Sequence, residues 1–221
     1  APNFEEDYYA LLMSKTRSEE AVARKTDLAD LEKQLLPMRQ LLMQHRNKRI
    51  RPLLDTKIMT SWNGLMIRGF ADAGRLLEKP EYIATASKAA KFILENMRND
   101  QGQLLHSYNR GEARFNAYVV DYAFFIEGLL ALHRATGKEE WLSYADTLTQ
   151  AQMKRFWDEK NGGFFFTSSD HEILIARAKN PIDSVRPSGN SVTAANLLYL
   201  YKQLDKPEYL KTAQRAIDSV S

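Results

Sequence analysis

The sequence predicts an all-α protein: an α/α toroid of antiparallel helical hairpins covering part of a ring, with short β segments in the connecting loops. Three observations support this fold class. Apolar residues recur at helical spacing along most of the 221 residues. Only 10 glycines and 7 prolines occur, too few for an all-β fold rich in tight turns. A hairpin-sized motif also recurs three times. We expect one toroid domain over residues 1–221, with residues 1–17 as an irregular lead-in.

The first half of the chain carries the clearest helical signals. Residues 18–48 place Leu28, Leu31 and Leu35 on one helix face, and Pro37 predicts a kink or a break there. Thr60 or Ser61 can cap a helix that ends near residue 77. Pro80 suits the first turn of a helix that ends near residue 98. A turn at 99–102 then leads into a short strand at 103–108.

The second half repeats this order. We expect helices at 120–136 and 139–157, a turn at 161–163 and a short strand at 164–167. A loop over residues 170–188 leads to helices at 190–204 and 207–220.

An internal repeat organises these elements. Lys-Pro-Glu-Tyr at 79–82 recurs as Lys-Glu-Glu-Trp at 138–141 and as Lys-Pro-Glu-Tyr at 206–209. Each aromatic residue is followed four positions later by an alanine, namely Ala86, Ala145 and Ala213. Small alanines allow neighbouring helices to approach, and the aromatic rings fill the gaps between hairpins. The aromatic residues lie 59 and 68 positions apart (141 − 82 and 209 − 141), which favours a ring of helix pairs over solenoid repeats of roughly 34–47 residues.

Composition excludes several function classes. The net charge is +3, which argues against a strongly basic nucleic-acid-binding domain. No apolar run approaches the roughly 18 residues that a membrane span needs. There is no cysteine, and the four histidines lack metal-ligand spacing, so we expect neither a metal nor a cofactor. The chain begins with Ala-Pro and stops inside a helical pattern at Ser221, so we expect it to be part of a longer protein. We expect that protein to be cytoplasmic.

The loops before the first helix of each pair carry the candidate catalytic residues. Asp55, Asp121 and Asp183 lie in or near these loops, and two carboxylates there can act as general acid and base on a glycosidic bond. Alternatively, each aspartate caps a helix or pairs with a local arginine. Capping is the favoured interpretation for Asp121, which directly precedes an apolar helix, whereas both interpretations stay open for Asp55 and Asp183.

The same loops contain candidate substrate-binding residues that can stack on a sugar ring or form hydrogen bonds with its hydroxyls: Trp62, Asn63, Tyr122, Arg186, Ser188 and Asn190. Core packing is the more common role of tryptophan, and the two asparagines can also cap helices. Because first-helix N-termini expose unpaired N–H groups, this end of the ring suits polar or anionic ligands.

Several segments together resemble the spermatogenesis-associated-protein-like, thioredoxin-domain-containing family. They are Asp-Thr-Lys at 55–57, Ser-Trp-Asn-Gly-Leu-Met at 61–66, Asp-Tyr-Ala-Phe at 121–124, Gly-Gly-Phe-Phe at 162–165 and Pro-Ser-Gly-Asn-Ser at 187–191, with Asn-Phe-Glu at 3–5. The resemblance implies a helical toroid similar to six-hairpin glycosidases and N-acylglucosamine 2-epimerases, joined in the longer chain to a thioredoxin-like domain.

Two function hypotheses follow. The first is a toroid that binds or processes a carbohydrate or another polar small molecule, with chemistry like that of a glycoside hydrolase or a sugar epimerase. It predicts a pocket lined by the three loops. The second is a non-catalytic helical scaffold or interaction domain that partners a thioredoxin-like domain. It predicts that the polar loop residues bond to one another and leave no cavity.

Overall fold

The computed structural model describes residues 14–171 and 175–219, and these fall in two compact units, residues 1–54 and 55–221. The expectation of one toroid domain over residues 1–221 stays a prediction. Of the predicted lead-in, residues 1–13 lie outside the described residues, as does the motif at 3–5.

The first unit contains helices α1 (Arg17–Ala23) and α2 (Leu28–Asn47). The prediction of one helical stretch over 18–48 is wrong, because Lys25 adopts a positive φ of 53° and Asp27 caps a new helix by accepting the Ala29 N–H. Pro37 lies inside α2 and does not end it.

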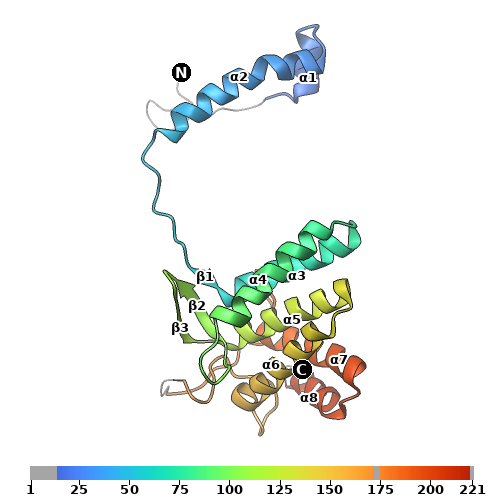
Figure 1. The fold of residues 1–221 in the computed structure, drawn as a ribbon. Helices are drawn as coiled ribbons and strands as arrows, with labels where there is room; N and C mark the ends of the chain where they lie inside the picture. Colours follow the sequence, from blue (N-terminus) through green and yellow to red (C-terminus); the bar gives the residue numbers. More distant parts are fainter. Residues whose placement is uncertain (1–13, 172–174, 220–221) are drawn as a thin grey trace. The chain divides into compact units, whose positions relative to one another are not determined.

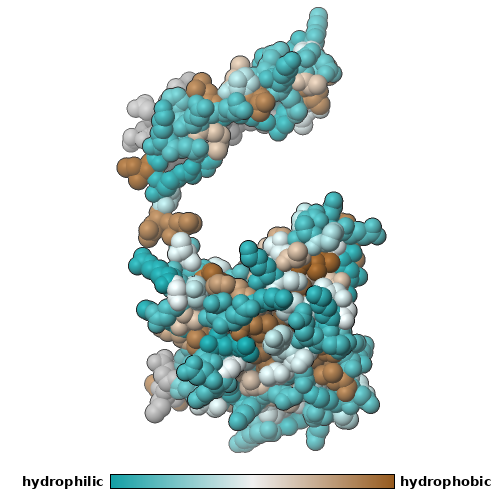
Figure 2. Space-filling view, in the orientation of Figure 1, coloured by the Kyte–Doolittle hydropathy of each residue, from teal (hydrophilic) through white to brown (hydrophobic). Residues whose placement is uncertain are grey.

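The second unit consists mainly of three helix pairs (Figure 1). They are α3 (Thr60–Leu76) with α4 (Pro80–Asn96), α5 (Val119–Thr136) with α6 (Glu139–Phe156), and α7 (Gly189–Leu204) with α8 (Pro207–Asp218). The prediction of a mostly helical fold with small β segments is confirmed. Hydrophilic residues cover most of the face of this unit that Figure 2 shows.

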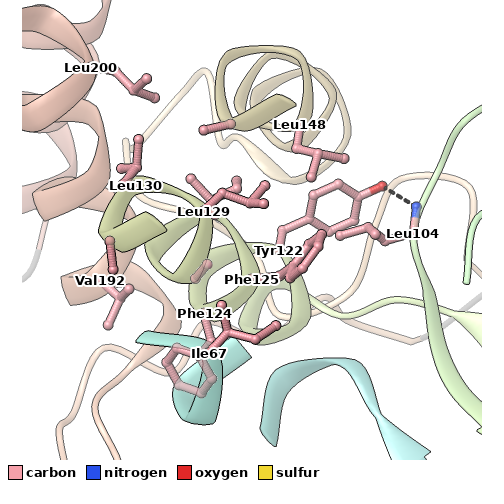
Figure 3. Close-up of a cluster of buried hydrophobic side chains, with 14 of the residues drawn as sticks. Ile67, Leu104, Tyr122, Phe124, Phe125, Leu129, Leu130, Leu148, Val192 and Leu200 are labelled. Atoms are coloured by element: carbon pink, nitrogen blue, oxygen red, sulfur yellow. Dashed lines mark hydrogen bonds between the residues drawn. The ribbon is translucent and has the colours of Figure 1, made fainter. Parts of the chain in front are cut away.

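Close backbone contact between α3 and α5 positions the middle of this array. A Cβ atom at Gly64 would lie 2.6 Å from Phe124 C and Phe125 N, and one at Gly128 would lie 2.9 Å from Gly64 O. Only glycine permits this approach. The apolar residues of α5 fill the core between the first helices, and Figure 3 shows Phe124 and Leu129 packed among side chains of the neighbouring elements.

The repeat motif joins neighbouring hairpins. The three repeat alanines, Ala86, Ala145 and Ala213, are all buried, as the small-residue argument predicts. In the third copy, Lys206 Nζ and Tyr209 Oη both donate to the Asp146 carboxylate of α6, at 2.8 and 2.5 Å. The motif therefore ties α8 to the preceding pair as well as starting a helix.

A three-stranded antiparallel sheet forms from segments that lie before two of the first helices: one strand precedes α3, and two strands precede α5. It contains β1 (Ile58–Met59), β2 (Leu105–Asn109) and β3 (Glu112–Asn116) in the order β1–β2–β3. Arg110 and Gly111 both have positive φ, which is the two-residue type I′ geometry that suits hairpins. The strand predicted at 103–108 corresponds to β2, which begins two residues later, at Leu105, and ends at Asn109. The strand predicted at 164–167 is wrong, because only the isolated bridge between Trp157 and Phe164 forms there.

None of the helices within residues 14–171 and 175–219 combines the length and the apolar character needed to cross a bilayer.

Candidate functional site

The N-terminal ends of α3 and α5 meet at a buried carboxylate, Asp121 in the first turn of α5. Asp121 Oδ1 accepts the Ser61 N–H of α3 at 3.0 Å, and Oδ2 accepts the Tyr118 N–H at 2.9 Å. The second oxygen also bonds to Nδ1 of His106 on β2 at 2.8 Å. One fully buried side chain therefore holds α3, β2 and the start of α5 together. Asp121 thus lies inside α5 rather than before it, and its bond to the N–H of Tyr118, the N-cap residue, is the contact of a capping box.

The N-terminal ends of α5 and α7 also lie against each other. A Cβ atom at Gly189 would lie 2.9 Å from Val119 Cγ1, so the first turn of α7 packs directly on α5. The Val119 N–H donates to Phe166 O at 3.0 Å, which brings the loop after α6 to the same place. The three pre-helix loops consequently meet at one end of the array, with α5 in the middle.

A cavity of about 160 Å³ lies between the N-terminal ends of α5 and α7. Its walls include Val119, Phe166 and Gly189, together with the loop over residues 180–188. Arg186 and Ser188, two of the predicted substrate-binding residues, line it. Since a water molecule needs about 10–15 Å³ of such space, the cavity has room for a small polar ligand.

Asp183 stands beside this cavity. Its Oδ1 accepts the Ser188 N–H at 2.7 Å and the Ser191 hydroxyl at 2.9 Å, at the N-terminus of α7. The backbone N–H of Ser188 is the main reason that the pKa of Asp183 lies below its ordinary value, with the Ser191 hydroxyl contributing. Asp183 is therefore a carboxylate at neutral pH, suited to accept a ligand hydroxyl rather than to donate a proton.

Asp55 is placed differently. Its side chain is exposed, and its carboxylate accepts the Lys57 N–H at 3.2 Å and pairs with Lys57 Nζ at 3.3 Å. The backbone N–H of Lys57 lowers the pKa of Asp55. Of the two interpretations left open for Asp55, pairing within its own loop is what the contacts show. No hydrogen bond or ion pair within the described part of the chain joins two of the three candidate aspartates.

The predicted stacking residues divide between core and surface. Tyr122 is fully buried, and its hydroxyl accepts the Leu104 N–H at 3.1 Å (Figure 3). The same hydroxyl accepts an N–H from Arg155 Nη1 at 3.0 Å. Burial raises its pKa. Tyr122 thus has no ring face open to a ligand, which corrects its predicted role. Trp62, by contrast, is 62% exposed in the first turn of α3, so core packing is not its role.

The two asparagines bond to the backbone. Asn63 Nδ2 donates to Met59 O at 2.9 Å, inside the first turn of α3. Asn190 accepts the Phe164 N–H at 2.6 Å and donates to Phe164 O at 3.0 Å. The Asn190 side chain is buried, and both of its hydrogen bonds connect α7 to the loop after α6. Such self-contained bonding is what the scaffold hypothesis predicts. The carbohydrate hypothesis predicts a pocket lined by all three loops, whereas the cavity beside Arg186 is lined from the α5 and α7 ends and by no residue of the loop before α3.

Sequence reasoning missed two groups of residues at this end. The first is His106, whose bond to Asp121 depends on the β2–β3 hairpin. The Arg110-Gly111 pair between alternating residues was the available signal for that hairpin. The second is Arg155, which donates to both oxygens of Asp170. Burial opposes ionisation of Asp170, but hydrogen bonds from Arg155 and Ser168 and the charge of Arg155 together outweigh it and lower the pKa of this carboxyl.

Among residues 14–171 and 175–219, no group of three or more His, Cys, Asp or Glu side chains is arranged to hold a metal ion.

Relatives with similar sequences support the family resemblance. Human spermatogenesis-associated protein 20 is 36% identical over 170 residues, which cover 72% of this chain and 22% of that protein. The mouse protein of the same name gives the same values. An uncharacterized protein of Caenorhabditis elegans is 32% identical over 214 residues, or 93% of this chain and 29% of that protein. The resemblance to this family is confirmed, and the chain spans less than a third of the length of these relatives. No protein-family model matches the chain.

Solved structures with a similar fold include several enzymes that act on carbohydrates. A D-mannose isomerase matches with a TM-score of 0.61 at 17% identity, covering 74% of this chain and 40% of that one. The cellobiose 2-epimerase of Spirochaeta thermophila matches with a TM-score of 0.59 at 16% identity, covering 73% of this chain and 42% of that one. A GH76 α-mannanase of Bacteroides thetaiotaomicron matches with a TM-score of 0.61 at 14% identity, covering 78% of this chain and 45% of that one. These matches confirm the α/α toroid fold, in the six-hairpin glycosidase-like class.

Proposed function

We propose that this chain forms part of a carbohydrate-binding and carbohydrate-processing toroid, whose ligand site lies at the N-terminal ends of α3, α5 and α7. The observation that carries the proposal is the meeting of the three pre-helix loops at that end. Asp121 joins α3 to α5, and Gly189 packs α7 on α5. The structural neighbours, which include a D-mannose isomerase, a cellobiose 2-epimerase and an α-mannanase, support the class of ligand by analogy of fold.

The chemistry of the cavity agrees with a hydroxyl-rich ligand. Arg186 supplies N–H donors, and Asp183 supplies an ionised acceptor beside it. The exposed indole of Trp62 at the α3 end offers an apolar face of the kind that packs on the carbon side of a sugar. Asp183 and Arg186 are therefore the residues that we place at the ligand, whereas Asp121 supports the site from within.

Binding measurements with the 221-residue chain test this function. The probes are D-mannose, N-acetyl-D-glucosamine and D-glucuronate, each followed by NMR chemical-shift changes in 15N-labelled protein. We expect at least one probe to shift the amide signals of residues 118–120 and 184–190. The Arg186→Ala variant should weaken that binding by about tenfold or more, since it removes a charged donor from the cavity wall.

A matched control uses the opposite end of the array. Arg75 is exposed near the C-terminal end of α3, and Arg75→Ala should leave the affinity unchanged. If none of the three sugars binds, or if both variants weaken binding equally, the proposed function is wrong.

A further inference from the structure

His106 and Asp121 form a pair whose geometry goes beyond helix capping. The His106 side chain is 22% exposed, while the Asp121 carboxylate is fully buried, and Nδ1 lies 2.8 Å from Oδ2. A buried carboxylate that faces one nitrogen of a partly exposed imidazole fixes the orientation of the ring. The other nitrogen, Nε2, has no hydrogen-bond partner among the residues that the structure describes.

The surrounding hydrogen bonds assign the tautomer. Asp121 already accepts N–H groups from Ser61 and Tyr118, so its carboxylate acts as an acceptor on both oxygens. The bond to His106 then needs a donor, which places the proton of the neutral imidazole on Nδ1. Nε2 is consequently left with a lone pair that can accept a hydrogen bond.

Aromatic rings fix the imidazole from the side. Tyr118 meets His106 edge to face, with ring centroids 5.0 Å apart, and Tyr118 in turn stacks on Phe166 at 4.8 Å. Phe166 also lines the cavity between α5 and α7. His106 is therefore joined to the cavity wall through a short series of packed rings.

The strand opposite His106 carries an unusual residue. The register pairs Leu105 with Asn116 and Ser107 with Arg114, which places Phe115 opposite His106. Phe115 has a φ of +64° and is 69% exposed. A bulky residue in the left-handed region is strained, and such strain concentrates at functional sites. Phe115 lines a hollow together with Ser107 and Arg114 of the same hairpin, and an exposed aromatic ring offers an apolar surface on which a sugar can pack.

From these observations we propose that His106 is a ligand-binding residue of the proposed site at the N-terminal ends of α3, α5 and α7. Its Nε2 accepts a hydrogen bond from a sugar hydroxyl, and Asp121 acts as the positioning residue. This inference rests on the proposed function and names a contact that sequence reasoning did not identify. It also explains why Asp121, a residue that caps a helix, bonds to a side chain from a separate strand.

The substitution His106→Asn tests the proposal with little change to the fold. An asparagine amide keeps an N–H donor near the position of Nδ1 but has no counterpart of Nε2. The matched control is His133→Asn, because His133 is also half-buried and bonded, to Tyr199, but lies in the last turn of α5, at the other end of the helix. The probes are the three sugars named above, measured with the 221-residue chain.

We expect ring 15N spectra of the free protein to show the Nδ1–H tautomer at His106, and the Nε2 signal to move when sugar binds. His106→Asn should weaken binding by about tenfold with an unchanged thermal midpoint, while His133→Asn should bind normally. Sugar binding that leaves Nε2 unmoved and His106→Asn unaffected would overturn this inference alone. The absence of binding by every sugar would overturn the proposed function together with it.

Discussion

The close approach of α3 and α5 yields the sharpest stability prediction, the substitution Gly64→Ala. A Cβ atom at this position would lie 2.6 Å from two backbone atoms of α5 and 2.7 Å from a third, Phe124 O. Ordinary contact begins at 3.4 Å, so α3 and α5 would have to separate locally by about 0.8 Å (3.4 − 2.6). Backbone atoms cannot rotate away as a flexible side chain does, so the helices themselves must move.

The magnitude follows from two opposing effects. Alanine gains about 1 kcal/mol over glycine in helix propensity. Overpacking a tight interface costs about 1–3 kcal/mol and occasionally more, and three backbone contacts place this site at the upper end. We therefore expect a net loss of about 2 kcal/mol in the free energy of unfolding.

The same helix supplies the control. A Cβ atom at Gly69 meets nothing within 4 Å, so Gly69→Ala should stabilise the protein by about 0.5–1 kcal/mol through helix propensity alone. Urea unfolding followed by circular dichroism measures both values, with an unchanged m-value indicating the same unfolding transition. If Gly64→Ala is as stable as the wild type, the close contact between α3 and α5 is not as described.

Three further substitutions test the contacts around the site by urea unfolding. Asp121→Asn removes the charged acceptor of three N–H donors, those of Ser61, Tyr118 and His106, so it should cost about 2–4 kcal/mol. The exposed Asp55→Asn should leave the midpoint unchanged, and equal effects of the two substitutions would contradict the anchoring role. Asp170→Asn removes the partner of buried Arg155 and should cost about 1–2 kcal/mol at neutral pH, a value reduced because Asp170 is about half exposed. Since the pKa of Asp170 is lowered in the folded state, this loss should shrink as the pH falls below about 4; a constant difference down to pH 2 would contradict that coupling. Tyr209→Phe removes the hydroxyl bonded to Asp146 and should lower the free energy of unfolding by about 1–2 kcal/mol, while Tyr144→Phe should leave it unchanged. A larger loss for Tyr144→Phe than for Tyr209→Phe would exclude the Lys-Pro-Glu-Tyr motif at 206–209 as a link between hairpins.

The parts of the fold that the sequence predicted are those with local signals. Helical periodicity and the recurring Lys-Pro-Glu-Tyr motif identified the three helix pairs, since each depends on residues a few positions apart. The break between α1 and α2 was missed because Lys25 is not a residue type that normally marks a left-handed turn.

The sheet shows why other parts were not predicted. β1 has two residues, too few for an alternating pattern, and it forms only by pairing with β2 across about fifty positions of sequence. β3 consists of largely exposed residues, so no apolar alternation marks it. The strand predicted at 164–167 contains Phe164, Phe165 and Phe166, which have high β propensity but no neighbouring strand beyond a single bridge.

The candidate site divides in the same way. Sequence placed Asp121, Asp183 and Arg186 at one end of the array, because the repeat aligns their loops. It could not show that His106 bonds to Asp121 across 15 positions, nor that Tyr122 turns its hydroxyl into the core toward Leu104. Such partners are set by how the hairpin β2–β3 folds onto α5, and no local pattern encodes that contact.

The meeting of the three pre-helix loops can be measured directly by paramagnetic relaxation enhancement from a nitroxide on Trp62→Cys, since the chain has no other cysteine. We expect signal broadening at residues 118–121 and 188–190, which the contacts place near the start of α3. Residues 134–138 should stay sharp, because the 18 residues of α5 separate its ends by about 27 Å. Broadening at 134–138, or sharp signals at both 118–121 and 188–190, would contradict a shared site at this end of the helices.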